Sequence, residues 1–385
     1  MNGKIKVKLG YIKWWFLRQL FYKQFLPSEE DLKSGEARKL LKVLTGGSYK
    51  ETLTNIVEWQ ERNIQYWDER ADMFNLLLVL STIAFVFVLL PVQQYWWILP
   101  LIILCFYFSG NFLPYFISAL LLATEVIVAI LVFVYVANTS VIIMTIGLSV
   151  IFGSILSLLL YDILKYRHLK RVVPEFRFGD SFKISLPVEK ILQYRLAICR
   201  DYAKLTATLL MNFFNSKDSI YFISIPNHVA TTIEIKNKIY VLDQRLPVMT
   251  REKWIEYWNR KLSCKKMPVQ EYKLIVENGR IRVKEFSRKK LRIVSNVPQV
   301  DVGTLTDKIA SKLGINQISD KLEPDVKIIL KHFALLYDKD ETVEFSLLKT
   351  IMNKLDSELC NNTRKVTKIE AFQDGLDLAL AVYIR

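Results

Sequence analysis

Three side chains near the middle of the chain have the types and the order that nucleophilic catalysis requires. Cys199 opens a segment, 198–214, whose apolar residues recur at helical spacing. At the start of a helix, the dipole and the unbonded N–H groups lower the pKa of a thiol and favour the thiolate. His228 could then act as the base, and Asp243 could orient its imidazole. The pattern predicts a thiol nucleophile served by a base and a carboxylate.

The residues that follow the expected helix predict an antiparallel sheet. Three runs are rich in β-branched and aromatic residues, as strands are: 219–225, 229–235 and 239–242. A Lys-Asn-Lys turn separates the last two runs. A tight hairpin there would set Asp243 opposite Thr231, about three residues (~10 Å) from His228. We therefore expect a bulge or bend near Pro226 to close the gap between the two side chains.

The sequence around these residues resembles the signature blocks of transglutaminase-like cysteine enzymes. The blocks are ICRDYAKLTATLL at 198–210, NHVATTIEI at 227–235 and IYVLDQRLP at 239–247. The resemblance implies a papain-like cysteine hydrolase core in which Cys199 attacks an amide carbon to give a thioester, served by His228 and Asp243. Water as acceptor would make the protein a peptidase or amidase, and an amine would make it an acyltransferase. No metal or organic cofactor is implied, because the sequence has neither a ligand cluster nor a phosphate-binding glycine loop.

Two positions depart from the pattern common in this superfamily. Ala197 stands where members commonly have a glycine two residues before the cysteine, and Ala230 stands where they commonly have an aromatic residue two after the histidine. The backbone N–H of Cys199 is one donor for an oxyanion hole, and Gln193, six residues earlier, is a second candidate. The departures keep open an alternative function, a non-catalytic membrane scaffold or peptide-binding protein.

A long uncharged block precedes the catalytic segment. Between Met73 and Leu160 the sole charged residue is Glu125, whereas a soluble helix of that length would have a polar face. Because each spanning helix needs ~20 apolar residues, the block fits about four spans. Glu125 would lie in the third, either as a substrate or proton site or as a neutral carboxyl that bonds between helices. The expected spans are near 73–91, 95–110, 115–136 and 140–161.

Charge beside this block predicts how the chain crosses the bilayer. Basic residues follow the block directly: Lys165, Arg167, Lys170 and Arg171. Positive flanks mark the cytoplasmic side. We therefore expect a multi-pass protein of the cell membrane, with both termini and the catalytic domain in the cytoplasm and the lipid bilayer as a partner. The chain also resembles uncharacterised archaeal membrane proteins with a transglutaminase-like domain.

The expected architecture is α+β, with a transglutaminase-like core interrupted by a four-helix transmembrane insertion. The core would be a catalytic helix packed on an antiparallel sheet. The expected parts are a basic aromatic segment at 1–50, the first core helix at 51–72, the transmembrane region at 73–161, the catalytic core at 172–260 and a C-terminal α+β unit at 261–385.

The C-terminal unit contains no motif that identifies its chemistry. Its expected strands are 272–276, 281–286, 291–294 and 369–384, and its expected helices are 303–313, 325–337 and 343–359. The net charge of the chain is +15, but the basic residues of this unit alternate with acidic ones and no aromatic platform accompanies them. We therefore expect no nucleic-acid partner. A peptide or protein substrate is what the resemblance to transglutaminase-like enzymes implies. Transport past Glu125 has less support, because four short spans with one ionisable residue offer few polar sites.

Overall fold

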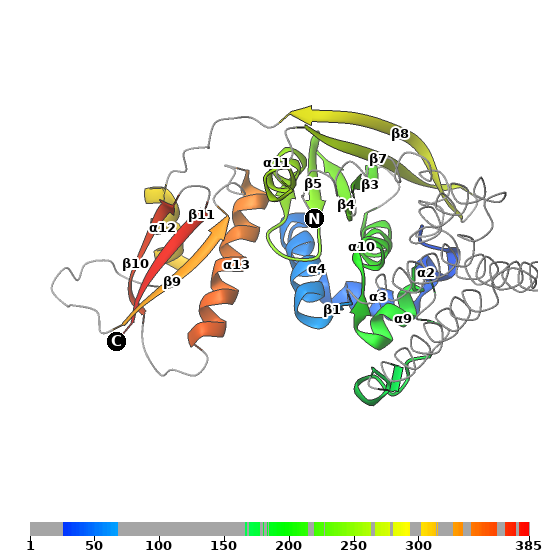
Figure 1. Cartoon of the computed structure of the whole chain (residues 1–385), viewed down its shortest axis with the longest axis horizontal. Helices are drawn as coiled ribbons and strands as arrows, with labels where there is room; N and C mark the ends of the chain where they lie inside the picture. The colour runs from blue at the N-terminus through cyan, green and yellow to red at the C-terminus, as the bar shows by residue number, and fades with distance from the viewer. Residues whose placement is uncertain are drawn as a thin grey trace, which may run out of the picture. The chain divides into compact units, whose positions relative to one another are not determined.

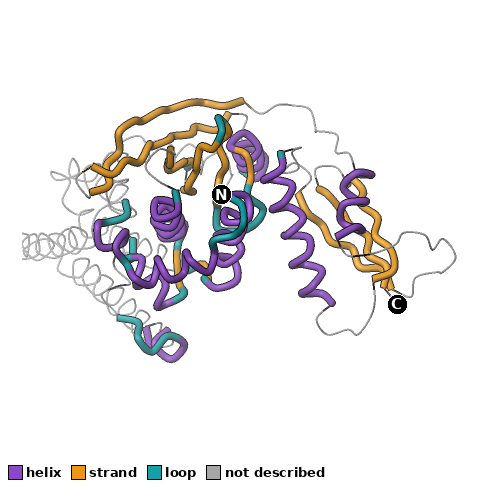
Figure 2. The backbone as a smooth tube through the Cα atoms, turned by 180° about the vertical axis from the view of Figure 1, so that it is seen from behind, coloured by secondary structure: helices purple, strands orange, loops and turns teal. Residues whose placement is uncertain are grey.

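The computed structural model describes part of the 385-residue chain: 26–67, 166–167, 169–177, 180, 183, 185–214, 219–226, 228–262, 266–277, 280–292, 302–312, 314, 326–333, 340–359, 366–374 and 377–384. Helices and mainly antiparallel sheets make up these residues (Figures 1 and 2), which confirms the α+β class. The chain divides into two compact units. The first contains the described residues of Pro27–Ile64 and Tyr202–Arg385, and the second contains those of Gln65–Asp201.

Three N-terminal helices belong to the first unit: α2 (Glu29–Lys33), α3 (Gly35–Leu44) and α4 (Tyr49–Asn63). Each begins after a serine whose side chain accepts a hydrogen bond from a backbone N–H of the first turn: Ser28, Ser34 and Ser48. Such caps satisfy N–H groups that have no partner within the helix. Leu53 and Ile56 of α4 are fully buried, so this helix contributes directly to the core.

The helix expected at 51–72 is shorter in the structure. Helix α4 ends at Asn63 because Ile64 adopts an extended backbone. The next two residues form the short strand β1 (Gln65–Tyr66), and 68–72 lie outside the described residues.

The six-stranded sheet of the first unit has the order β6-β5-β4-β3-β7-β8, and every neighbouring pair is antiparallel. Its strands are β3 (Ser219–Ile225), β4 (His228–Ile235), β5 (Lys238–Leu242), β6 (Met249–Thr250), β7 (Lys266–Glu277) and β8 (Arg280–Arg292). Pairing with β7 makes β8 one long strand, where two had been expected at 281–286 and 291–294. Because β7 and β8 join the sheet, the sheet crosses the boundary expected at residue 261.

The turn between β4 and β5 contains two residues, Lys236 and Asn237, and both have positive φ. Such a two-residue turn matches the twist of the strands, and asparagine tolerates the left-handed conformation well. The turn therefore fixes the register of the two strands that carry His228 and lead to Asp243.

Different helices contact the two faces of this sheet. Thr231 of β4 donates from its hydroxyl to the carbonyl of Ala203 at 2.8 Å, which attaches α10 (Cys199–Phe213) to one face. Ala230 lies on the opposite face, because successive side chains of a strand alternate. There it shares a buried cluster with Trp254 of α11 (Arg251–Lys261).

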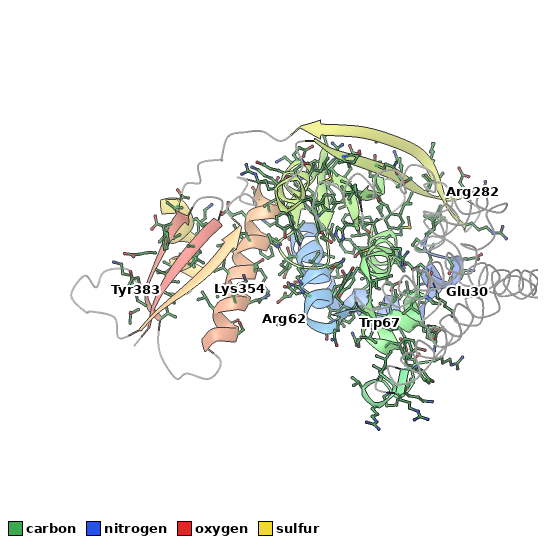
Figure 3. The ribbon with its side chains drawn as sticks, viewed as in Figure 1. Glu30, Arg62, Trp67, Arg282, Lys354 and Tyr383 are labelled. Carbon is green, nitrogen blue, oxygen red and sulfur yellow. The ribbon has the colours of Figure 1, made fainter. Side chains whose placement is uncertain are left out.

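The C-terminal part of the first unit is a three-stranded antiparallel sheet with two helices. Its elements are α12 (Val302–Lys312), β9 (Val326–Phe333), α13 (Glu341–Leu359), β10 (Val366–Asp374) and β11 (Asp377–Ile384), and the strand order is β10-β11-β9. Leu305, Leu347 and Leu380 belong to the apolar cluster that joins helices and sheet. Helix α13 also contacts α4, where Asn353 donates to Glu58 at 2.9 Å. Figure 3 labels Lys354 on α13 and Arg62 on α4.

Two expectations for this part were wrong. The helix expected at 325–337 is the strand β9, since a short apolar run fits either structure and pairing with β11 decides it. The strand expected at 369–384 is the hairpin of β10 and β11, which turns between Asp374 and Asp377. Helices α12 and α13 begin and end within two residues of the expected ranges.

The second unit contains β1, α9 (Val188–Tyr194), β2 (Leu196–Ala197) and the first turn of α10. Strands β1 and β2 are parallel, with Gln65 beside Leu196. The ring of Phe176 contacts Trp67 edge-on at 5.3 Å and Tyr194 at 5.0 Å. Trp67 is labelled in Figure 3. This small aromatic core anchors the chain just before Cys199.

The four expected spans and Glu125 lie outside the described residues, as do 1–25 of the basic aromatic segment. Within the residues that are described, no helix has the length and apolar character needed to cross a membrane.

Candidate active site

His228 and Asp243 form the most completely defined part of the site. Both carboxylate oxygens of Asp243 lie 2.9 Å from Nε2 of His228. His228 is the first residue of β4, and Asp243 directly follows the last residue of β5. The side chains are 9% and 11% exposed, so little water competes for this contact.

The strand register explains how these side chains meet. Leu242 pairs with Thr231, so Asp243 lies one residue closer to His228 than the expected pairing with Thr231 would place it. Strand β4 pairs with β3 and β5 without a register shift over the paired residues, and the bulge expected near Pro226 is not needed. Diagonal neighbours on one face of a sheet are within reach of long side chains. The gap is therefore closed by side chains rather than by a bend of the strand.

Asp243 has further hydrogen-bond donors besides the histidine. The indole N–H of Trp254 donates to Oδ2 at 2.8 Å, and the backbone N–H of Gln244 donates to Oδ1 at 2.8 Å. Burial raises the pKa of Asp243, but the charge of His228 and these hydrogen bonds outweigh burial and hold the pKa below its ordinary value of 3.8. The carboxylate is therefore ionised at neutral pH and favours a protonated imidazole.

Two aromatic rings of α11 lie close to the imidazole. The ring centroid of His228 lies 4.5 Å from that of Trp258 and 6.0 Å from that of Trp254. The ammonium of Lys261 lies 4.4 Å from the Trp258 centroid, on the same helix. The rings of Trp254 and Trp258 therefore pack beside the imidazole and limit the access of water to it. Ala230 contributes no ring, and the aromatic side chains near His228 come from α11.

Sequence reasoning missed Trp254 and Trp258. Their spacing of four residues on a helix that begins eight residues after Asp243 was the available signal. Periodicity alone assigns such a pair to a core, and only the register of β4 and β5 shows that the pair covers a titratable residue.

Cys199 is the first residue of α10, as expected, and its half-buried thiol is not in a disulfide. The fully buried carboxylate of Asp201 accepts hydrogen bonds from the backbone N–H groups of Ile198 at 3.1 Å and Leu186 at 2.8 Å. These bonds fix the chain on both sides of α9 against the start of α10. Asp201 therefore restrains the backbone that leads directly into Cys199.

Further contacts hold the body of α10. The hydroxyl of Tyr202 donates to the carbonyl of Ile64 at 2.7 Å, and Gln60 of α4 donates to the Thr206 hydroxyl at 2.8 Å. Helix α4 thus packs on α10, although Gln60 and Thr206 are 146 positions apart in sequence. Cys199 belongs to the second unit and the His228–Asp243 pair to the first. Separate contacts therefore position Cys199 and the His228–Asp243 pair.

The other candidate residues have more ordinary surroundings. Gln193 is exposed on α9, where its amide donates to Glu175 and accepts from Lys190, and its role in an oxyanion hole stays a prediction. Glu125 lies outside the described residues. In the part of the chain that the structure describes, no group of three or more His, Cys, Asp and Glu side chains could hold a metal ion.

Comparison with known proteins agrees with the resemblance noted in the sequence. Over 376 residues the chain is 27% identical to the UPF0252 protein MJECL39 of the archaeon Methanocaldococcus jannaschii. The aligned region covers 92% of this chain and 94% of that protein. No solved structure matches the chain significantly. A family model described as a transglutaminase-like domain matches residues 36–270, a range that contains α4, Cys199, His228 and Asp243. The match spans more than half of the sequence, and the chain therefore belongs to the transglutaminase-like domain family.

Proposed function

We propose that this protein is a membrane-anchored thiol enzyme that acts on amide or peptide bonds through Cys199, His228 and Asp243. The observation that carries the proposal is the contact of both Asp243 oxygens with His228 Nε2 at 2.9 Å. A carboxylate bonded to one ring nitrogen fixes the orientation of the imidazole and leaves the other nitrogen to exchange a proton with a thiol. Cys199 at the start of a helix supplies a thiol whose ionisation the helix dipole favours.

The reaction would proceed in two acyl-transfer steps. The Cys199 thiolate attacks the amide carbon, the C–N bond breaks, and the leaving amine takes the proton of the His228 imidazolium. The resulting thioester is then attacked by an acceptor whose proton passes to the imidazole, and the C–S bond breaks to restore the thiolate. Water as acceptor gives hydrolysis, and an amine gives acyl transfer. Asp243 stabilises the imidazolium in both steps.

The membrane part of the proposal rests on the sequence. Between Met73 and Leu160 only Glu125 is charged, and spanning helices of ~20 apolar residues fit this block about four times. The family match runs through the block, from α4 on one side to the catalytic segment on the other. An even number of spans would return the chain to the side on which it started. Both parts of the core would then meet in the cytoplasm.

The proposal can be tested by measuring how fast Cys199 reacts with iodoacetamide as a function of pH. The full chain would be purified in detergent with Cys105, Cys264 and Cys360 replaced. An activated pair should be modified rapidly near pH 6, because its thiol is ionised there, whereas a thiol of pKa about 8.5 is about 0.3% ionised at that pH.

The variant His228→Ala should slow the reaction at pH 6 by about a hundredfold and leave the rate at pH 9.5 nearly unchanged. Equal pH profiles for the two proteins would contradict the enzyme proposal. They would favour the alternative, a scaffold that binds a peptide or protein with a transglutaminase-like domain.

A further inference from the structure

We infer that helix α13 supports the active site by holding the loop after Asp243 in position. Ser346 of this helix is the positioning residue. The inference rests on the proposed function and extends it to a region outside the family match, which ends at residue 270. Ser346 would act on catalysis through the backbone and would not touch the substrate.

The loop from Asp243 to Val248 is held by helices that lie far away along the chain. The backbone N–H of Val248 donates to the hydroxyl of Ser346 at 2.7 Å, and both residues are fully buried. The backbone N–H of Leu246 donates to Glu61 of α4 at 3.1 Å. Since a buried N–H without an acceptor costs about 1–3 kcal/mol, each bond restrains the path of the loop.

The start of α13 is bonded to the strand that leads to Asp243. Oδ2 of the buried Asp340 accepts from Lys238 at 2.7 Å and from the Tyr240 hydroxyl at 3.1 Å, and both donors lie on β5. Oδ1 of the same carboxylate accepts from the backbone N–H of Thr342 at 2.9 Å. One carboxylate thus joins the N-terminal end of α13 to β5.

Helix α13 therefore contacts both the strand before Asp243 and the loop after it. The carboxylate in between must keep both oxygens 2.9 Å from His228. Hydrogen bonds weaken steeply when their geometry changes, and catalytic groups must be held within about 0.5 Å of the productive arrangement. A loop released from Ser346 would loosen the Asp243–His228 contact and raise the apparent pKa of the Cys199 thiol.

The chain offers a matched control for this experiment. Thr350 lies one turn after Ser346 on α13 and is also buried, but its hydroxyl donates to the Ser346 carbonyl within the helix. Ser346→Ala removes the acceptor of Val248, whereas Thr350→Ala removes a hydroxyl of the same helix without touching the loop. Both variants shorten a buried side chain, so a general loss of packing would affect them alike.

The measurement is again the pH dependence of Cys199 alkylation by iodoacetamide in the full chain. Ser346→Ala should lower the rate at pH 6 by about three- to tenfold and leave the rate at pH 9.5 unchanged, which corresponds to a higher apparent thiol pKa. Ser346→Thr, which keeps the hydroxyl, should restore the wild-type profile. Thr350→Ala should retain it.

Asp340→Asn provides a second variant should Ser346→Ala fail to fold. It keeps a side chain that can cap α13 but weakens the bond to Lys238, and it should shift the profile in the same direction. A wild-type profile in these variants, with His228→Ala still defective, would overturn the inference and leave the proposed function standing. A profile that does not depend on His228 would instead refute the proposed function.

Discussion

The proposed nucleophile, Cys199, and the proposed base, His228, are held in two different ways. Asp201, which fixes the start of α10, bonds to residues no more than fifteen positions away. The loop after Asp243 bonds instead to Glu61 and Ser346, which are 185 and 98 positions from their partners. The start of α10 therefore has local hydrogen bonds in addition to its distant contacts with β1 and Trp67, whereas the loop after Asp243 is held by the distant helices α4 and α13. Substitutions at the start of α10 should change how accessible the Cys199 thiol is. Substitutions around the loop after Asp243 should change how readily that thiol ionises.

The largest effect is expected for Asp243→Asn, which removes the charge that stabilises the imidazolium. The rate of Cys199 alkylation at pH 6 should fall by about a hundredfold, since an ordinary thiol is about 0.3% ionised there. The matched control is Glu252→Gln on the exposed face of α11, which should react like the wild type. A small effect of Asp243→Asn would mean that the base is not coupled to the thiol.

The second-largest effect is expected from Asp201, whose hydrogen bonds hold the start of α10. Asp201→Ala leaves the buried N–H groups of Ile198 and Leu186 without their acceptor and should lower the free energy of unfolding by about 2–4 kcal/mol. Urea denaturation of the full chain would measure it. The contact between His228 and Asp243 should survive, so the alkylation rate should keep a pH-dependent step. A stable variant with no change in unfolding would contradict the role given to Asp201.

Two tryptophans of α11 give a sharper test of the base. Trp254→Phe removes the N–H that donates to Asp243 and should lower the alkylation rate at pH 6 by about tenfold, because a hydrogen bond to a charged group is worth about 1.5–3 kcal/mol. The indole nitrogen of Trp258 is buried without a hydrogen-bond partner among the described residues, so Trp258→Phe should change the rate less than twofold. Equal effects would show that ring packing matters rather than the hydrogen bond.

The smallest effect concerns stability in acid. Burial raises the pKa of Asp340, but the bond from Lys238 and those from the start of α13 outweigh it and hold the pKa below 3.8. A carboxyl with a lowered folded-state pKa contributes stability that is present above pH 3.8 and is lost as the pH falls through the folded-state pKa. Asp340→Asn should therefore flatten the decline of the unfolding free energy below about pH 4. Urea titrations at pH 3 and pH 6 would measure the change.

The sequence predicted the elements whose signals are local. The apolar spacing of 198–214 and the β-branched runs on either side of Asn237 identified α10, β4 and β5, which the structure confirms. Helix 325–337 was predicted wrongly because its apolar run is short and ambiguous. Pairing across the sheet, which no local signal encodes, decides such cases.

The candidate site was predictable in part for the same reason. The types and order of Cys199, His228 and Asp243 identified the residues, and the His228–Asp243 contact is present. The residues that hold Asp243 and its loop were not predictable from the sequence. Trp254 looks like a core residue, and Ser346 lies in a segment without a chemical motif. A hydroxyl that accepts one backbone N–H leaves no pattern in a sequence.

The bond between Ser346 and Val248 has a consequence for the timing of synthesis. A ribosome adds about 5–20 residues per second and domains fold as they emerge, so the segment up to Asp243 leaves the ribosome several seconds before α13 does. During that interval Cys199 would be present without the helix that, as we infer, holds the loop after Asp243 in position. If Cys199 acts as proposed, a nascent chain should therefore be less reactive near pH 6 than the finished protein, and the thiol would reach its full reactivity only after α13 has folded.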